Sequence, residues 1–239
     1  IAFDAYSQAG NNLSIDRVLV RNLYDDDLKM NVVYTKGKLP VQYGTPDSVG
    51  VIVENVGALT QYNKVITVDV TGANTQTLTY TIDSIQSFTS KTIAIGGLAP
   101  TVTGVNTVTV SVPNDNDNSN NVKAYRLEAT ADYFGYVDTS AVSIKAALGN
   151  GLLLSKFRIN GTRSVRSVRA YINGGTTLNK VVYGVVLNSA GVVLARSEND
   201  TIVAADTAQW RSFTFPNWYD AIFTDTTFYV GIAQIGTGY

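Results

Sequence analysis

The chain of 239 residues contains no cysteine and no histidine. Without cysteine it has no disulfide, no thiolate nucleophile and no thiolate-bound metal. Without histidine, the usual Ser–His and Cys–His catalytic pairs, histidine-bound zinc and the commonest general base are all excluded. Glutamate is also scarce, occurring only as Glu54, Glu128 and Glu198. These absences predict that the chain is not an enzyme.

Charge and long apolar runs are scarce as well. Charged residues make up 15% of the chain, against about 25% in an average domain, and the net charge is -1. A chain without a long basic run lacks the electrostatic footprint of a nucleic-acid-binding protein. No run of about 18 apolar residues occurs, so the sequence predicts no membrane span.

What the chain does contain favours β-structure. Hydrophobic residues make up 45% and tyrosine occurs 14 times, while the β-branched Thr and Val favour the pleated state. Clusters of Gly, Asn and Asp separate short apolar runs, as in a sandwich. Within one run, Val108, Val110 and Val112 alternate with other residues and share one face. We predict an all-β fold of tandem β-sandwiches, immunoglobulin-like followed by jelly-roll-like.

The runs and turns divide the chain into three parts. Residues 1–21 read as the terminal strands of a preceding jelly-roll module, because two strands cannot bury a core alone. Residues 22–128 suit an immunoglobulin-like sandwich, and residues 129–239 a jelly-roll-like sandwich truncated at its C-terminus. The chain therefore reads as a segment of a longer polypeptide, and its short tether near residues 128–132 favours a rod-like arrangement. The expected strands are 28–34, 48–55, 64–71, 76–82, 91–95, 106–112 and 122–128, then 133–137, 152–159, 164–172, 180–187, 192–197, 210–215 and 227–235, with a helix candidate at 140–148.

Two acidic stretches are candidate metal sites. In residues 113–121 (PNDNDNSNN), carboxylates alternate with amides, and calcium prefers several oxygen ligands close in sequence. The EF-hand spacing is absent, so the stretch is either a polar hairpin turn, which we prefer, or a turn that also binds calcium. Residues 25–27 form a second acidic run, read as a solvated linker or as ligands at a domain junction. The calcium ligands in the first stretch would be Asn114, Asp115, Asn116 and Asp117.

Aromatic and basic residues gather in the last third of the chain. Trp210, Trp218 and Tyr219, together with aromatics at 133–136, could form a stacking platform for sugar rings, or could cap the core. A basic cluster in residues 156–169 could meet an acidic glycan or a lipid headgroup. We prefer to read that cluster as solvent-facing residues that protect strand edges. Its members are Lys156, Arg158, Arg163, Arg166 and Arg169.

Several stretches resemble known secreted modules. Residues 10–16 (GNNLSID) resemble the last hairpin of MAM-like or cleaved-adhesin jelly rolls of Bacteroidota. Residues 36–44, 53–57 and 106–121 resemble CARDB-like immunoglobulin-like modules, and residues from GLLLSKFRI to FYVGIA are similar to the jelly rolls that follow them. The resemblance implies export by the type IX route and display on the bacterial cell surface.

Four Asp-Ser/Thr-aliphatic triplets resemble the O-glycosylation motif of Bacteroidota exported proteins. Sugars attached there would shield the surface. The acceptors would be Ser48, Ser84, Thr201 and Thr207.

Together these observations predict a non-catalytic segment of a secreted surface protein, acting as adhesin or scaffold modules. The alternative is an accessory or carbohydrate-binding region of a large secreted peptidase or glycosidase. Expected partners are neighbouring modules of the same polypeptide and an extracellular glycan or protein. No cofactor is expected apart from the calcium considered above.

Overall fold

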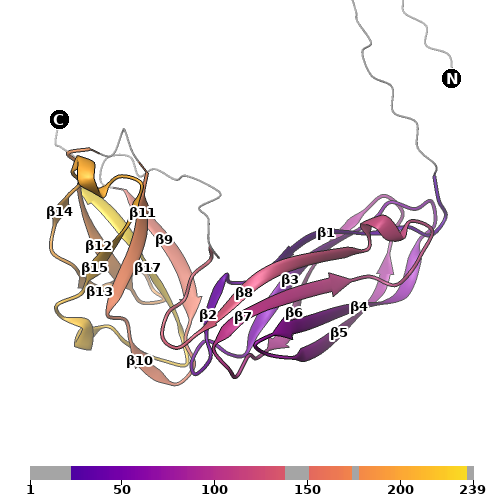
Figure 1. Cartoon of the computed structure of the whole chain (residues 1–239), viewed down its shortest axis with the longest axis horizontal. Coiled ribbons are helices and arrows are strands. Elements are labelled where there is room, and N and C mark those ends of the chain that lie inside the picture. Colours follow the sequence, from indigo (N-terminus) through magenta and orange to yellow (C-terminus); the bar gives the residue numbers. More distant parts are fainter. Residues whose placement is uncertain (1–22, 138–150, 174–177, 236–239) are drawn as a thin grey trace, which may run out of the picture.

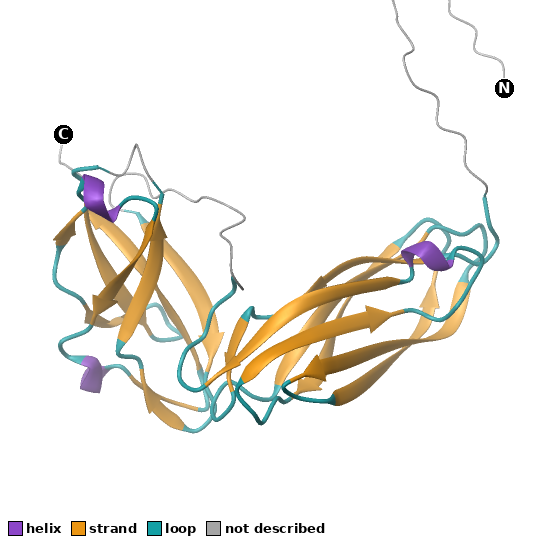
Figure 2. Cartoon of the chain, viewed as in Figure 1, coloured by secondary structure: helices purple, strands orange, loops and turns teal. Residues whose placement is uncertain are grey.

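The computed structural model describes residues 23–137, 151–173 and 178–235. These residues form two β-sandwiches joined end to end (Figure 1). The predicted all-β fold is therefore confirmed, and helix within these ranges is limited to three short 3-10 turns (Figure 2). The hairpin expected within 1–21 and the helix candidate at 140–148 lie outside the described residues. The 3-10 turns are η1 (Asn118–Asn120), η2 (Ala204–Asp206) and η3 (Trp218–Asp220).

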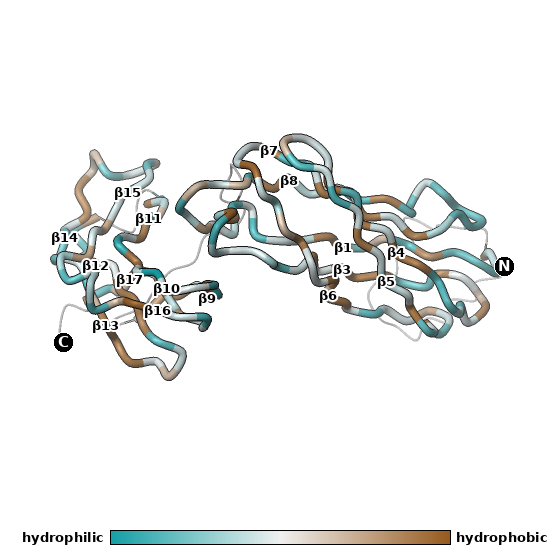
Figure 3. The backbone as a smooth tube through the Cα atoms, turned by 90° about the horizontal axis from the view of Figure 1, so that it is seen from below, coloured by the Kyte–Doolittle hydropathy of each residue, from teal (hydrophilic) through white to brown (hydrophobic). Residues whose placement is uncertain are grey.

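The first sandwich packs a three-stranded antiparallel sheet, in the order β1-β3-β6, against a five-stranded sheet in the order β2-β8-β7-β4-β5. Only β2 and β8 pair in parallel. Strands of both sheets alternate between buried and exposed residues, which Figure 3 shows as short hydrophobic and hydrophilic stretches along the chain. The strands are β1 (Leu28–Tyr34), β2 (Lys38–Pro40), β3 (Asp47–Asn55), β4 (Gln61–Gly72), β5 (Gln76–Ile85), β6 (Ser90–Leu98), β7 (Gly104–Ser111) and β8 (Val122–Thr130).

The second sandwich packs a sheet in the order β13-β12-β17-β9, with β14 beside β12, against two short two-stranded sheets. In one of them, which we call the ribbon, β11 pairs with β15; in the other, β10 pairs with β16. The ribbon turns Phe213 and Phe215 inward and leaves its other face to solvent. The strands are β9 (Leu152–Arg158), β10 (Thr162–Ser164), β11 (Ser167–Ile172), β12 (Val181–Leu187), β13 (Val193–Arg196), β14 (Asp200–Thr201), β15 (Gln209–Thr214), β16 (Ile222–Thr224) and β17 (Thr227–Ile235).

Most expected strands are found within a few residues of their predicted bounds, and three differences stand out. Residues 133–137 are not a strand; Gly135 makes only an isolated bridge to Lys38. The stretch 164–172 is divided between β10 and β11. The strands β2, β14 and β16 were not predicted, because two or three residues are too few to show alternation.

The joined sandwiches are bent, not rod-like. In Figure 1 the strands of the second sandwich run in a clearly different direction from those of the first. The short tether was expected to favour a straight arrangement. That expectation was wrong because the junction is set by side chains on its two sides, described below, and not by the length of the tether.

Gly184 sets how closely the sheet and the ribbon of the second sandwich approach. A Cβ added at this position in β12 would lie 2.7 Å from the Cβ of Phe213 and 2.8 Å from Cγ1 of Val168. Both distances are too short for carbon atoms, so a larger residue must push the layers apart. The ribbon can therefore pack closely against the sheet only because residue 184 has no side chain.

We predict that Gly184→Ala lowers the free energy of unfolding by about 1–3 kcal/mol, the usual cost of overpacking a core. Chemical denaturation of the purified chain measures this. The matched control is Gly96→Ala in β6, where nothing lies within 4 Å of an added Cβ. Equal effects of the two substitutions would contradict the proposed close approach.

Candidate functional site

The acidic loop 113–121 connects β7 to β8 at the end of the first sandwich that lies away from the second. Its side chains cap backbone amides: Oδ2 of Asp115 accepts from Leu28 N at 2.7 Å, and Oδ1 accepts from Asp117 N at 3.0 Å. Oδ1 of Asp117 accepts from the amide and hydroxyl of Ser119. The polar hairpin turn is thus present.

The same loop is fastened to the second acidic run. Asn116 and Asp26 exchange two hydrogen bonds, from Asp26 N to Asn116 Oδ1 at 3.1 Å and from Asn116 N to Asp26 O at 3.0 Å. Nδ2 of Asn120 donates to Oδ1 of Asp27 at 2.9 Å. The two stretches that were considered separately in the sequence therefore form one cluster. Residues 25–27 are part of a built corner and not only a solvated linker.

Buried acceptors in this corner bear on the calcium prediction. Asp27 is 7% exposed, and this burial is the main reason that its pKa is raised. The hydrogen bond from Asn120 lowers the pKa, and the neighbouring charges of Asp115, Asp117 and Asp26 raise it further. Within the described chain, three buried oxygens have no hydrogen-bond donor: Oδ1 of Asp26, Asn120 and Asn121. Across the described ranges of the chain, no group of three or more acidic side chains is placed to hold a metal ion. Any calcium would have to be bound partly by amide oxygens, and calcium binding stays a prediction.

The pH dependence of Asp27 is testable. A carboxyl whose folded pKa is raised stabilises the fold below its unfolded pKa, near 3.8, and loses that contribution as the pH rises through the folded value. We predict that Asp27→Asn, measured with a chelator present, is more stable than the parent at pH 7, and that the gain fades below pH 3.8. Denaturation curves across this range measure it. The exposed Asp25→Asn is the control, and a gain that persists at low pH would contradict the burial argument.

Calcium binding is tested by melting. If calcium binds the folded chain only, saturation to 100 times the dissociation constant adds about 2.7 kcal/mol of stability. Calcium binding at this corner would raise the melting temperature of the parent chain relative to chelator, and Asp27→Asn would lose this rise. An identical melting temperature with calcium and with chelator would contradict the prediction of calcium binding.

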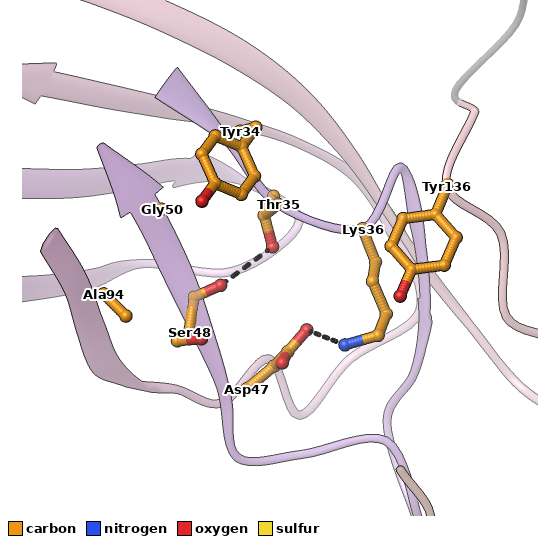
Figure 4. A pocket seen from close by; sticks show the side chains of 8 residues that line it. All are labelled: Tyr34, Thr35, Lys36, Asp47, Ser48, Gly50, Ala94 and Tyr136. Carbon is orange, nitrogen blue, oxygen red and sulfur yellow. Dashed lines mark hydrogen bonds and ion pairs between the residues drawn. The ribbon is translucent and has the colours of Figure 1, made fainter. Parts of the chain in front are cut away.

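A shallow hollow lies on the three-stranded sheet beside the junction (Figure 4). Its volume is about 200 Å³, below the 300–1,000 Å³, roughly, of typical small-molecule sites. Inside it, Nζ of Lys36 pairs with Asp47 at 2.7 Å, and Tyr34 lies over Gly50. A second hollow, of about 290 Å³, contains Glu198 and Asp200, and Asp200 is bound by Arg211.

The junction between the sandwiches is an aromatic cluster. Phe134 packs against the hydrophobic cores of both sandwiches, with its ring centroid 5.9 Å from Tyr43, 5.2 Å from Phe157 and 6.3 Å from Phe228. The ring of Tyr136 packs against Phe157 at 5.1 Å. Phe134 and Tyr136, which the sequence offered as sugar-stacking residues, are therefore used to join the domains.

Polar contacts reinforce the junction. Asn160 of the second sandwich donates from its backbone to Tyr43 O at 2.8 Å and from Nδ2 to Thr45 O at 2.5 Å. The hydroxyl of Tyr136 donates to the carbonyl of Lys156. Arg163 lies over the Tyr43 ring at 5.6 Å. Burial raises the pKa of Tyr43 to about 12, with Asp132 adding to the shift and Arg163 opposing it, so this phenol is neutral at physiological pH.

The remaining aromatic candidates lie on and next to the ribbon. Tyr171 and Trp210 are cross-strand partners with centroids 5.6 Å apart and rings at 67°. Trp218 and Tyr219, in η3, are 6.2 Å apart at 70°. Neither pair is coplanar, and Trp210 belongs to a different pair from Trp218 and Tyr219. Trp210, Trp218 and Tyr219 therefore do not form one flat platform, because η3 follows the end of β15 while Trp210 lies near its start; sugar binding by these residues stays a prediction.

Two members of the basic cluster lie over these indole rings. The guanidinium carbon of Arg169 is 5.8 Å from the Trp210 ring centre, and that of Arg166 is 4.7 Å from the Trp218 ring centre. The other three members lie elsewhere: Lys156 over Tyr229, Arg163 at the junction and Arg158 exposed at the end of β9. The sequence treated the arginines and the tryptophans as separate features. The β11–β15 pairing brings Arg169 to Trp210, and η3, which follows β15, places Trp218 beside Arg166.

The four predicted glycosylation acceptors differ in exposure. Thr201 in β14 is exposed, whereas Ser48, Ser84 and Thr207 are partly buried. The aspartate that precedes Thr207 is buried and paired with Arg211 at 2.8 Å. O-glycosylation stays a prediction, and Thr201 is the most accessible of the four acceptors.

Comparisons with known proteins give little beyond the fold. No protein family and no curated protein matches the chain. Among solved structures, it is similar to the CARDB domain of a Pyrococcus furiosus protein, described as in complex with di-metal ions. The identity is 16% and the TM-score 0.38, over 46% of this chain and 95% of that one. Residues 36–44, 53–57 and 106–121 resemble modules of that kind, and a likeness of this degree carries no inference about function or metals.

Proposed function

We propose that the chain is a non-catalytic segment of a secreted bacterial surface protein, in which two sandwiches act as one stiff unit for spacing and display. The observation that carries this proposal is Phe134, a tether residue that packs against both cores. A tether that is itself part of both cores cannot swing freely, and an adhesin or scaffold needs fixed spacing. Export and surface location rest on the sequence resemblance alone.

Features of the concave surfaces support the non-catalytic part of the proposal. The hollow beside the junction places Lys36 and Asp47 in an ion pair. In the second hollow, Asp200 is engaged by Arg211, so Glu198 is the remaining acid. Carboxylate-based glycoside hydrolysis needs a pair of acids flanking the bond. Neither hollow offers such a pair with both acids available.

We predict that Phe134→Ala loosens the junction. The substitution removes a contact from both cores and should cost roughly 2 kcal/mol, less than the 3–5 kcal/mol of a fully buried phenylalanine. Small-angle scattering of the parent chain should fit one bent arrangement, while the variant should require a range of inter-domain angles. The control is Phe88→Ala, which deletes a ring that is 65% exposed in the first sandwich.

Scattering also provides the outcome that contradicts the proposal. If the parent chain itself behaves as two independently tumbling halves, the stiff unit does not exist. If Phe134→Ala leaves the profile of a rigid parent unchanged, the stiffness has another source.

Exposed aromatics favour a second candidate, a carbohydrate-binding region attached to a secreted hydrolase. Tyr171, Trp210, Trp218 and Tyr219 are between 38% and 57% exposed. Large aromatic rings provide apolar faces at low entropic cost, and they are enriched where a protein binds a partner. The full reading frame distinguishes the two candidates: a catalytic domain in it favours the accessory role, and further sandwich repeats favour the adhesin.

A further inference from the structure

The outer face of the β11–β15 ribbon and the adjoining η3 carry two guanidinium–indole pairs. Arg169 lies over Trp210 near one end, and Arg166 lies over Trp218 near the other. All four side chains are exposed. We call Arg166, Arg169, Tyr171, Trp210, Trp218 and Tyr219 together the ribbon face.

The β-ladder fixes the spacing of the two pairs. Tyr171 faces Trp210 across the ribbon, and Arg169 faces Ser212. Beyond the last paired residues, Phe215 N donates to Arg166 O at 2.9 Å. Arg169, opposite Ser212, and Arg166, opposite Phe215, are three residues apart along the chain, or about 10 Å at 3.4 Å per residue. The two guanidinium groups are therefore anchored about 10 Å apart, one on β11 and one just before it, and a ligand that contacts both must extend along this stretch of chain.

The charges on the ribbon are distributed unequally between its two faces. Arg211 points inward from β15 and is paired with both Asp200 and Asp206. Among the described residues, no acidic side chain forms an ion pair with Arg166 or Arg169. Two exposed acids, Glu198, which lines a hollow with Ser212 and Thr214, and Asp220, which lies in η3, form no ion pair with these arginines. Both guanidinium groups are exposed and lie against aromatic rings, so they are open to an external anion.

A stacked guanidinium suits a particular ligand chemistry. Stacking on an indole restricts the arginine while leaving its N–H edge available for bidentate hydrogen bonds to a carboxylate or sulfate. The exposed Tyr171 and Tyr219 add apolar surface of the kind that covers the faces of sugar rings. A nucleic acid would require many phosphate contacts from a basic surface, and this chain has a net charge of -1.

We propose that the ribbon face binds an anionic polysaccharide, with carboxylate or sulfate groups of the polymer docking on Arg166 and Arg169. This inference rests on the proposed display role, because it names what the displayed second sandwich would contact. It places the charged groups of the ligand at the two arginines and its sugar rings against the neighbouring tyrosines.

The test is binding of the full 239-residue chain to three polymers: alginate, which carries carboxylates, dextran sulfate, which carries sulfates, and dextran, which is neutral. We expect binding to one or both acidic polymers, weakened by salt, and no binding to dextran. The double variant R166Q/R169Q should weaken binding at least roughly tenfold, since hydrogen bonds to charged groups are worth that much or more. Replacing both arginines by lysine should restore it only in part, because lysine lacks the planar fork.

Controls separate a failed site from a damaged fold. Arg158→Gln removes an exposed arginine of β9 that lies outside the ribbon face, and its affinity should match that of the parent. Circular dichroism and melting must show the double variant folded. Unchanged affinity of the folded double variant, equal binding to dextran, or tighter binding to single-stranded DNA than to either acidic polymer would each overturn the inference. Binding to none of the polymers would overturn it too. The proposed function would not fall with it, because scattering of the parent chain and of Phe134→Ala tests separately whether the two sandwiches form a stiff unit.

Discussion

The arrangement of the chain depends on one ring, Phe134, that is shared by two hydrophobic cores. An ordinary linker leaves domains free to move, because few contacts cross it. Here the linker contributes a side chain to the packing on both sides, and Tyr43 and Asn160 supply polar and aromatic contacts around it. Moving one sandwich relative to the other would expose apolar surface in both cores at once. The bend seen in Figure 1 is therefore a consequence of packing.

How much the sequence could predict follows from the range over which each signal acts. Alternation acts between neighbours, and it correctly placed Val108, Val110 and Val112 in the core. It cannot show which aromatic meets another domain, so the sequence left Phe134 and Tyr136 open between stacking on a sugar and capping a core. It also cannot bring together positions that lie far apart in the chain. The two acidic stretches are about 90 residues apart, and the hydrogen bonds of Asp26 with Asn116 follow only from the folded topology.

The ribbon illustrates how topology assigns roles to chemically identical side chains. Arg211 and Arg169 lie on paired strands, one pointing in and one pointing out. The inward arginine is neutralised by two aspartates, and the outward one lies against an indole. From composition alone both are solvent-facing charges. Gly184 contributes as well, because its lack of a side chain lets the ribbon pack closely against β12. This close packing keeps the outward residues of the ribbon in place.

The parallel pairing of β2 with β8 has a mechanical consequence. The chain enters the first sandwich through β1 at the end away from the junction and leaves it through β8 at the junction. Tension along a tethered polypeptide therefore pulls β8 lengthwise between β2 and β7, which hydrogen-bond to its two edges. Bonds loaded in shear give way together, whereas a strand peeled from one end breaks them singly. This topology suits the display role proposed above, in which the chain would carry load along its length.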